Sequence, residues 1–169
     1  MIRLLPLQDS DREQFVRDNQ EAFRCGAMEE FGLRDSRFEE PGEIISRATI
    51  LKSIDDPHSQ TYRIVADGVV AGGIVLILDE AGCEGVLDLL FVAPTMHSRG
   101  IGQAVWRKVE EMHPQVKRWI TYTPYFEKRN IHFYVNRLGF KIVAYYHEKF
   151  PDPVHPSAAD EMFKFEKVV

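Results

Sequence analysis

The chain has 169 residues, 44% of them hydrophobic and 28% charged, and a formal net charge of −5. This length and apolar content predict a single domain over residues 1–169 with a packed core. The negative charge argues against general nucleic-acid binding, which needs a basic face for the phosphate groups. Cys25 and Cys83 have neither the number nor the spacing of a disulfide framework or a metal site, so we expect free thiols and no metal.

Targeting segments are not expected. The N-terminal stretch has no long apolar core and no small-residue cleavage site, so it does not have the pattern of a signal peptide. No apolar run reaches the roughly 18 residues that a membrane-spanning helix needs. These features predict a soluble, cytoplasmic protein without a membrane partner.

The first third of the chain predicts one strand and two helices. Residues 2–7 form a short apolar run that is typical of a strand. Ser10 and Glu13 have the spacing of a capping box, which indicates the start of a helix. Residues 25–40 are charged and contain glycine, so a loop is expected there. A second helix is expected over residues 41–54, with a proline in its first turn.

The middle of the chain predicts three strands. Residues 61–78 contain two apolar runs joined at Asp67-Gly68, a strong hairpin signal. Residues 85–94 are apolar on both faces, as expected for a central strand. Asp88 is the only polar interruption of that strand.

The remaining elements complete a mixed α/β pattern. They are a helix over residues 101–112, a strand over 117–125, a short helix over 130–140, and strands over 141–150 and 161–169. The predicted order is β-α-α-β-β-β-α-β-α-β-β. It indicates a mixed α/β fold with an antiparallel start.

The segment before the third helix carries two closely spaced glycines, Gly100 and Gly102. The first amide groups of a helix are unpaired and the helix dipole is positive there, so phosphate oxygens are attracted. The glycines remove side chains that would keep a pyrophosphate away, and Arg99 could add a charge. A structural turn is the alternative, because neither the G-x-G-x-x-G pattern nor the phosphate-loop pattern is complete.

This loop resembles the acetyl-coenzyme A loop of the GNAT family of N-acetyltransferases, Gln/Arg-x-x-Gly-x-Gly/Ala. The aligned residues are His97, Ser98, Arg99, Gly100, Ile101 and Gly102, with His97 replacing the usual Gln or Arg. Residues 130–140 are similar to a second motif of the family, an Asn followed by Phe-Tyr-x-x-x-Gly-Phe. The matching residues are Asn130, Phe133, Tyr134, Gly139 and Phe140. Two matches in the right order are more specific than either one.

The resemblance implies a single-domain GNAT-type α/β fold, in which about four helices flank a mixed, mostly antiparallel sheet of six to seven strands. It implies direct transfer of an acetyl group from acetyl-CoA to an amine in a ternary complex. The residues that it places at the coenzyme are Leu90, Phe91, Val92, His97, Ser98, Arg99, Gly100, Ile101, Gly102, Gln103, Asn130, Phe133 and Tyr134.

Such a reaction needs a base, an oxyanion donor and an acid. At pH 7 less than roughly 0.1% of an alkyl amine is neutral and able to attack. Asp88 is our candidate base, acting through a water, and Glu84 is a weaker second choice. Tyr134 is our candidate acid for the leaving thiolate. By resemblance, the amide of Val92 is the oxyanion donor. The structural alternatives are that Asp88 holds a neighbouring loop or arginine and that Tyr134 is a core aromatic.

The acceptor is not specified by the sequence. The resemblance places its groove at residues 25–55 and 150–160, where His147 could also contribute or could simply lie at the surface. Five carboxylates in the first of these segments favour a polyamine or another cationic acceptor: Glu29, Glu30, Asp35, Glu39 and Glu40. The alternative is that they belong to a solvated loop. Peptide N-termini, amino acids and aminoglycosides stay open.

Other functions and assemblies are also compatible with the sequence. One rival is a non-catalytic module that senses acyl-CoA, and another is a nucleotide-binding α/β protein. Family members often form homodimers, which this sequence neither requires nor excludes.

Overall fold

The computed structural model describes residues 1–31, 38–97, 99–154 and 161–169. Its strands form one seven-stranded sheet in the order β1-β2-β3-β4-β5-β7-β6. The strands are β1 (Ile2–Pro6), β2 (Ser59–Ala66), β3 (Val69–Leu78), β4 (Glu84–Val92), β5 (Arg118–Pro124), β6 (Lys141–Tyr146) and β7 (Met162–Val168). Neighbouring strands are antiparallel except for the parallel pair β4 and β5. The predicted mixed, mostly antiparallel sheet is therefore confirmed.

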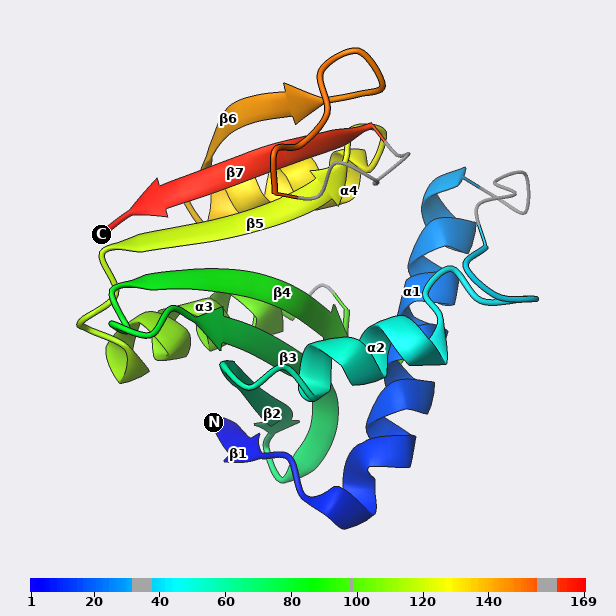
Figure 1. Ribbon diagram of the computed structural model, residues 1–169. Helices are drawn as coiled ribbons and strands as arrows, with labels where there is room; N and C mark the ends of the chain where they lie inside the picture. Colours follow the sequence, from blue (N-terminus) through cyan, green and yellow to red (C-terminus); the bar gives the residue numbers. More distant parts are fainter. Residues whose placement is uncertain (32–37, 98, 155–160) are drawn as a thin grey trace.

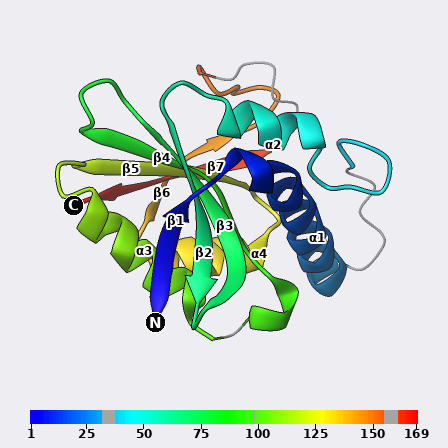
Figure 2. The same cartoon turned by 90° about the horizontal axis from the view of Figure 1, so that it is seen from below.

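Helices cover both faces of this sheet. The helices are α1 (Arg12–Phe31), α2 (Arg47–Ile54), α3 (Ile101–Met112) and α4 (Lys128–His132), and α4 continues into a π-helical turn, η4 (Phe133–Arg137). Within the described residues, short 3-10 turns also occur at η1 (Asp9–Asp11) and η3 (Pro94–Met96). The helices α1 and α2 lie on one face, and α3 and α4 lie on the other (Figures 1 and 2). None of the helices in the described ranges is long and apolar enough to cross a membrane.

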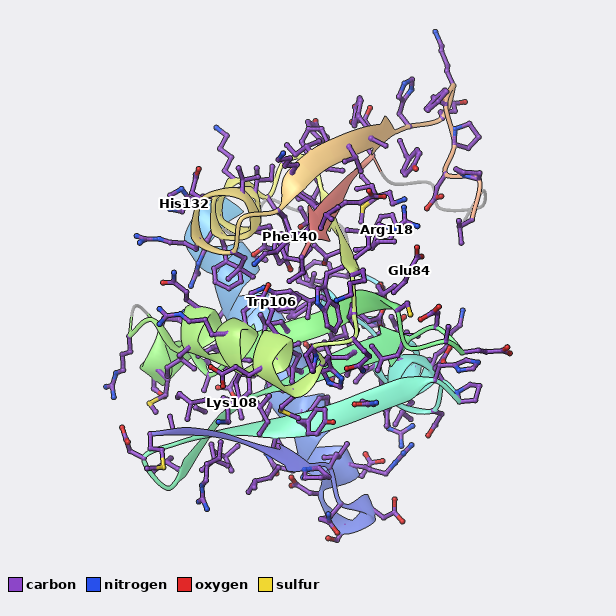
Figure 3. All side chains as sticks on the ribbon, turned by 90° about the vertical axis from the view of Figure 1, so that its left-hand side faces the viewer. Glu84, Trp106, Lys108, Arg118, His132 and Phe140 are labelled. Atoms are coloured by element: carbon purple, nitrogen blue, oxygen red, sulfur yellow. The ribbon has the colours of Figure 1, made fainter. Side chains whose placement is uncertain are left out.

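Each face of the sheet has its own hydrophobic core. On the α3 side, the Trp106 ring packs 5.2 Å from both Trp119 and Phe140, between the helix and the C-terminal strands (Figure 3). On the α1 side, Phe15 packs edge-on against Phe91 of β4, with ring centroids 5.1 Å apart. These two layers fix the sheet between the helix pairs.

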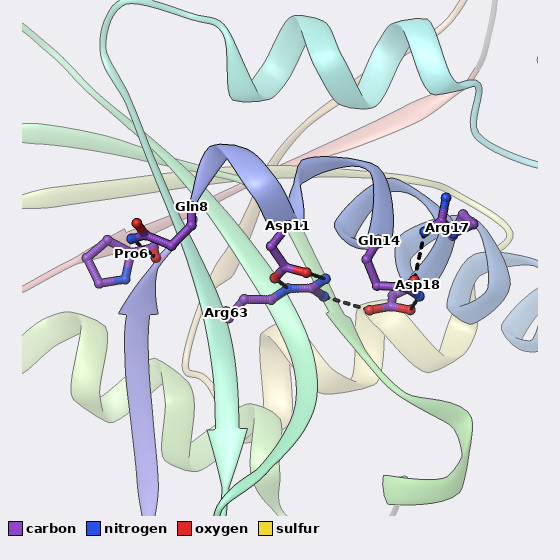
Figure 4. A network of polar contacts seen from close by, with 7 residues as sticks. All are labelled: Pro6, Gln8, Asp11, Gln14, Arg17, Asp18 and Arg63. Atoms are coloured by element: carbon purple, nitrogen blue, oxygen red, sulfur yellow. Dashed lines mark hydrogen bonds and ion pairs between the residues drawn. The ribbon is translucent and has the colours of Figure 1, made fainter.

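The start of α1 is anchored to β2 by a buried arginine. Arg63 is 5% exposed, and its guanidinium bonds Asp11 in η1 and Asp18 in α1 (Figure 4). It also lies 5.2 Å from the Phe15 ring centroid. A buried guanidinium is tolerated here because two carboxylates and an aromatic face replace its water shell.

The N-terminal helices differ from the sequence prediction at their boundaries. The capping box at Ser10 is not formed, since a 3-10 turn precedes α1 and Glu13 pairs with Arg47. Helix α1 also extends into the segment predicted as a loop. Helix α2 begins later than predicted, because Ser46 caps it by accepting the Thr49 amide at 3.0 Å. The hairpin turn agrees with the prediction, and Asp67 and Gly68 both have positive φ angles, 50° and 85°.

Strand β4 contains a bulge at Asp88. Val75 and Leu76 are consecutive in β3, yet their partners in β4 are Leu89 and Leu87. Asp88 is the extra residue between those partners, and its side chain is exposed. Leu87 packs in the α3-side core, whereas Leu89 packs in the α1-side core. The polar interruption of this central strand is thus a residue that the ladder leaves unpaired.

Candidate active site

The sheet divides between its two parallel strands. In the described chain, β4 and β5 pair only at Glu84–Arg118, Gly85–Trp119 and Val86–Ile120. Glu84 and Arg118 form an ion pair at this junction (Figure 3). Beyond it the two strands diverge (Figure 1), and the Thr121 hydroxyl donates to the Leu87 carbonyl at 2.9 Å. The C-terminal half of β4 therefore has an edge without a neighbouring strand.

Val92 presents its backbone to this split. The next residue, Ala93, donates its N–H to Ala71 on the β3 side at 2.8 Å. Successive residues of a strand direct their peptide groups to opposite edges, so the N–H and C=O of Val92 point toward the split. The His97 Nε2 atom lies 2.8 Å from the Val92 carbonyl oxygen, which agrees with this direction. The Val92 N–H thus has the orientation that an oxyanion donor needs.

The two glycines of the loop are required for different structural reasons. Gly100 caps α3 with a left-handed φ of 70°, and a Cβ there would meet nothing within 4 Å. Gly102 lies inside the first turn, where a Cβ would come 2.8 Å from Cζ of Phe133. One glycine therefore permits the turn, and the other makes room for an aromatic ring of η4. Arg99 is exposed, and Ser98 lies outside the described residues.

Other predicted coenzyme residues lie in different surroundings. Gln103 donates to the Arg137 carbonyl at 3.3 Å, which ties α3 to η4. Leu90 and Ile101 pack in the α3-side core. Phe91 is 4% exposed and faces α1. Its side chain is therefore on the opposite face of the sheet from the glycine loop.

His97 connects the two sides of the split. Its Nε2 atom bonds Val92 of β4, and its Nδ1 atom lies 3.0 Å from Nη2 of Arg129 in α4. A carbonyl oxygen can only accept and a guanidinium can only donate, so the ring carries its proton on Nε2 and accepts at Nδ1. The sequence assigned His97 to the coenzyme and gave no signal for the contact with Arg129.

Tyr134 lies among aromatic rings below the split. Its ring centroid is 5.4 Å from Phe165 and 6.1 Å from Phe140. The Thr121 hydroxyl lies nearby and donates to the Leu87 carbonyl at 2.9 Å. Burial raises the pKa of Tyr134 to about 12, so the phenol is protonated at neutral pH.

The helix around Tyr134 contains one residue more than the motif predicts. Four residues separate Tyr134 from Gly139, whereas the motif as aligned has three. The structure accommodates the extra residue as the π-helical turn, in which the Leu138 N–H donates to the Phe133 carbonyl at 3.1 Å. Single π-helical turns are inserted residues that recur at functional sites. The chain therefore departs from the predicted motif by one inserted residue between Tyr134 and Gly139.

Asn130 belongs to a polar cluster at the end of β5. Its amide nitrogen donates to the Glu127 carboxylate and lies 3.4 Å from Oγ1 of Thr123, whose hydroxyl donates to Glu127 at 3.2 Å. The sequence reading missed Thr121, Thr123 and Glu127. The available signal was the alternation of threonines on the buried face of β5, where apolar residues are expected.

Among the described residues, some of the acidic candidates form hydrogen bonds or ion pairs, and Asp88 does not. Asp88 has neither a hydrogen bond nor an ion pair within the described part of the chain. Glu84 is engaged with Arg118. Glu39 accepts from Ser46 and Thr49, and Glu40 accepts from Gln20 and the Arg47 amide: these two carboxylates stabilise the entry to α2. Asp35 and the side chains of Glu29 and Glu30 lie outside the described part.

The two remaining predictions concern His147 and a metal site. The His147 ring lies 5.2 Å from Tyr145, and its backbone bridges to Phe150. Among the described residues, no group of three His, Cys, Asp or Glu side chains could hold a metal ion.

Comparisons with known proteins agree with this geometry. A family model described as "Acetyltransferase (GNAT) family" matches residues 15–140. The chain is 37% identical over 172 residues to the uncharacterized protein YrkN of Bacillus subtilis, and the match covers 96% of this chain and 90% of that protein.

Solved structures share the fold at low sequence identity. The ribosomal-protein-S18-alanine N-acetyltransferase of Escherichia coli has a TM-score of 0.71 at 14% identity, over 100% of this chain and 94% of that chain. The PaiA N-acetyltransferase of Thermoplasma acidophilum, in complex with coenzyme A, has a TM-score of 0.69 at 17% identity, over 100% and 99%. The spermidine N-acetyltransferase of Vibrio cholerae, in complex with CoA and spermine, has a TM-score of 0.66 at 13% identity, over 99% and 95%.

Proposed function

Because this chain belongs to the acetyltransferase (GNAT) family, we propose that it is a cytoplasmic amine N-acetyltransferase that uses acetyl-CoA as cosubstrate. The acetyl group would pass directly to the amine of a small molecule or a peptide in a ternary complex. The observation that carries this proposal is the strand-free edge of β4, with the Val92 N–H directed into the split beside the glycine-capped start of α3.

The residues around the split fit an acyl-CoA. The first amide groups of α3 supply donors for a pyrophosphate, and Gly100 leaves open space in front of them. The edge of β4 offers backbone groups to an extended arm, as an edge strand does. We propose that Leu90, Gln103 and Asn130 line this path, and that Phe91 contributes to the core instead.

Three groups of the chain would supply the oxyanion donor, the base and the hydrogen-bond donor to the leaving sulfur. The Val92 N–H would donate to the carbonyl oxygen on which charge develops. Asp88, exposed at the bulge, would accept the amine's proton through a water. Tyr134, whose phenol is protonated at neutral pH, would hold its proton toward the departing sulfur.

The acceptor is proposed as a class. The fold relatives include an enzyme named for a ribosomal protein's alanine and one bound to spermine, so peptide and polyamine acceptors both occur on this fold. Glu39 and Glu40 are engaged by their own loop, which weakens the argument from charge for a polyamine. We therefore propose a primary amine on a small molecule or a peptide N-terminus.

Release of free CoA tests the proposal. The protein is incubated with acetyl-CoA and a panel of polyamines, amino acids, aminoglycosides and N-terminal peptides, and thiol is measured with a chromogenic reagent. Turnover with at least one amine is expected. Tight coenzyme binding without turnover on any amine would favour an acyl-CoA sensor. Thermal stabilisation by NAD or ATP, but not by acetyl-CoA, would favour a nucleotide-binding protein.

A further inference from the structure

We propose that His97 is a positioning residue that holds Val92 at the split, and that Arg129 orients His97 for this role. The proposal rests on the proposed function, because the group being positioned is the Val92 N–H. It departs from the sequence expectation, in which His97 contacts the coenzyme.

The need for such a residue follows from the end of β4. On its β3 edge, Val92 is aligned with Gly72, and Ala93 is tied to Ala71 at 2.8 Å. On the split edge, pairing with β5 has already stopped at Val86. A backbone donor can act on a developing charge only when its direction is fixed beforehand. Something other than a strand must therefore hold this edge.

His97 supplies that contact from the loop that follows. Its Nε2–H donates to the Val92 carbonyl at 2.8 Å, a good hydrogen-bond length. In a strand, the C=O and N–H of one residue point to the same edge, so fixing the carbonyl also fixes the direction of the N–H. The ring is half-buried, which shields this bond from water.

Arg129 completes the arrangement from the opposite wall. Its Nη2 donates to Nδ1 at 3.0 Å, which requires the tautomer that has a proton on Nε2. The other tautomer would direct two donors at each other and two acceptors at each other. Arg129 thus selects the tautomer that can hold Val92, as an outer partner orients a ligating histidine.

Glutamine at this position would preserve both bonds. Its amide nitrogen can donate to Val92 while its oxygen accepts from Arg129, in the same donor-and-acceptor pattern as the neutral ring. Alanine would remove both bonds, so the pair His97→Gln and His97→Ala separates the hydrogen-bonding pattern from the imidazole itself. His132, exposed on α4, supplies a matched control as His132→Ala, and Lys128→Ala is the control for Arg129→Ala.

The test compares these variants in kinetics and in binding. We expect His97→Ala to lower kcat by about tenfold or more, less than the roughly 10²–10³ for removal of an oxyanion donor itself. The Kd for free CoA should change by less than about threefold, and His97→Gln should recover most of kcat. Arg129→Ala should also lower kcat. The loss of kcat in the double variant should be smaller than the two single losses combined. The ring ¹⁵N shifts should report the Nε2–H tautomer in the wild type, and the population of that tautomer should fall in Arg129→Ala.

A turnover-independent measurement separates this proposal from the proposed function. Calorimetry without acceptor gives the affinities of acetyl-CoA and of CoA, and a held Val92 N–H should favour the acetyl form. His97→Ala should reduce this preference, whether or not an acceptor amine is found. An unchanged preference, or a weaker CoA affinity with unchanged kcat, would overturn the positioning role and make His97 a direct coenzyme contact or a bystander. Absence of wild-type turnover with a reduced preference would count against the proposed function alone.

Discussion

The hydroxyl of Tyr134 shows how a residue's surroundings limit its chemistry. Burial raises its pKa to about 12, whereas a thiol ionises near 8.5. Full proton transfer from this phenol to a thiolate would be uphill by roughly three pKa units, about 4–5 kcal/mol. We therefore expect Tyr134 to stabilise the developing thiolate as a hydrogen-bond donor that keeps its proton.

Replacement of Tyr134 by Phe tests this role. We expect kcat to fall about 10–100-fold while the Kd for CoA stays within about twofold, because the ring packing is retained. A kcat equal to that of the wild type would leave the ring with a packing role only.

The same substitution should alter stability at alkaline pH. The folded pKa lies above the unfolded value of 10, so the protonated phenol contributes stability below about pH 10 that is lost as the pH rises toward 12. Urea unfolding at pH 9 and pH 11 should show a smaller loss of stability in Tyr134→Phe than in the wild type, by on the order of 1 kcal/mol. Equal losses in both proteins would contradict the buried, protonated phenol.

Asp88 offers the second residue-scale prediction. As a base, Asp88 takes part in the chemical step, so Asp88→Asn should lower kcat/KM by about tenfold or more. Glu84→Gln is the control on the same strand, because Glu84 is engaged with Arg118. A kcat/KM in Asp88→Asn equal to that of the wild type would remove Asp88 from the reaction and point to a water network.

At the scale of elements, the contact between α3 and η4 controls where Tyr134 lies. Gly102 in α3 allows the approach of Phe133, the residue before Tyr134. Gly26 in α1 is also helical, but a Cβ there would meet nothing within 4 Å. These two glycines separate intrinsic helix propensity from packing.

We expect Gly102→Ala and Gly26→Ala to change stability in opposite directions. Gly26→Ala should stabilise by up to about 1 kcal/mol, since alanine favours the helix. Gly102→Ala should destabilise by about 1–3 kcal/mol, because the ring of Phe133 must move, and it should also lower kcat. Urea unfolding and steady-state kinetics measure both effects. Stabilisation by Gly102→Ala would show that the ring moves without cost.

The elements also show what a sequence can and cannot predict. The order of helices and strands and the Asp67-Gly68 turn follow from local periodicity and turn chemistry, and they were predicted. The bulge at Asp88 depends on the alignment of β4 with β3, which local patterns do not contain. The start of α2 at Ser46 is a local cap on the Thr49 amide, a signal that the prediction of a helix from residue 41 did not use. The glycine loop was predictable as a motif, but the contact between His97 and Arg129 joins segments whose proximity only the folded sheet determines.

For the whole molecule, the split makes the site a junction of two subassemblies. One contains β1 to β4 with α1 to α3, and the other contains β5 to β7 with α4. The contacts that join them include three paired positions at the base of the split, the Thr121–Leu87 bond, and the ion pair between Lys167 and Glu110. A ligand that contacts both walls should therefore stabilise both together.

Hydrogen exchange with bound CoA tests this coupling. At CoA concentrations 100 times its Kd, we expect protection of up to about 100-fold in both β4 and α4, and a rise in Tm of about 5–10 °C. Strands β1 and β2, distant from the split, are the internal control, and NAD is the ligand control. Protection confined to one wall would contradict binding across the split.

The bulge at Asp88 has a genetic consequence of its own. Leu87 and Leu89 already face opposite layers and already align with consecutive residues of β3, so a strand without Asp88 would be a regular ladder with both cores intact. A single-codon deletion at this position should therefore be tolerated by the fold while straightening β4 where it leaves β5. Substitution of Asp88 removes a carboxylate and keeps the bend, whereas its deletion removes both, so comparison of the two variants isolates the contribution of backbone shape to activity.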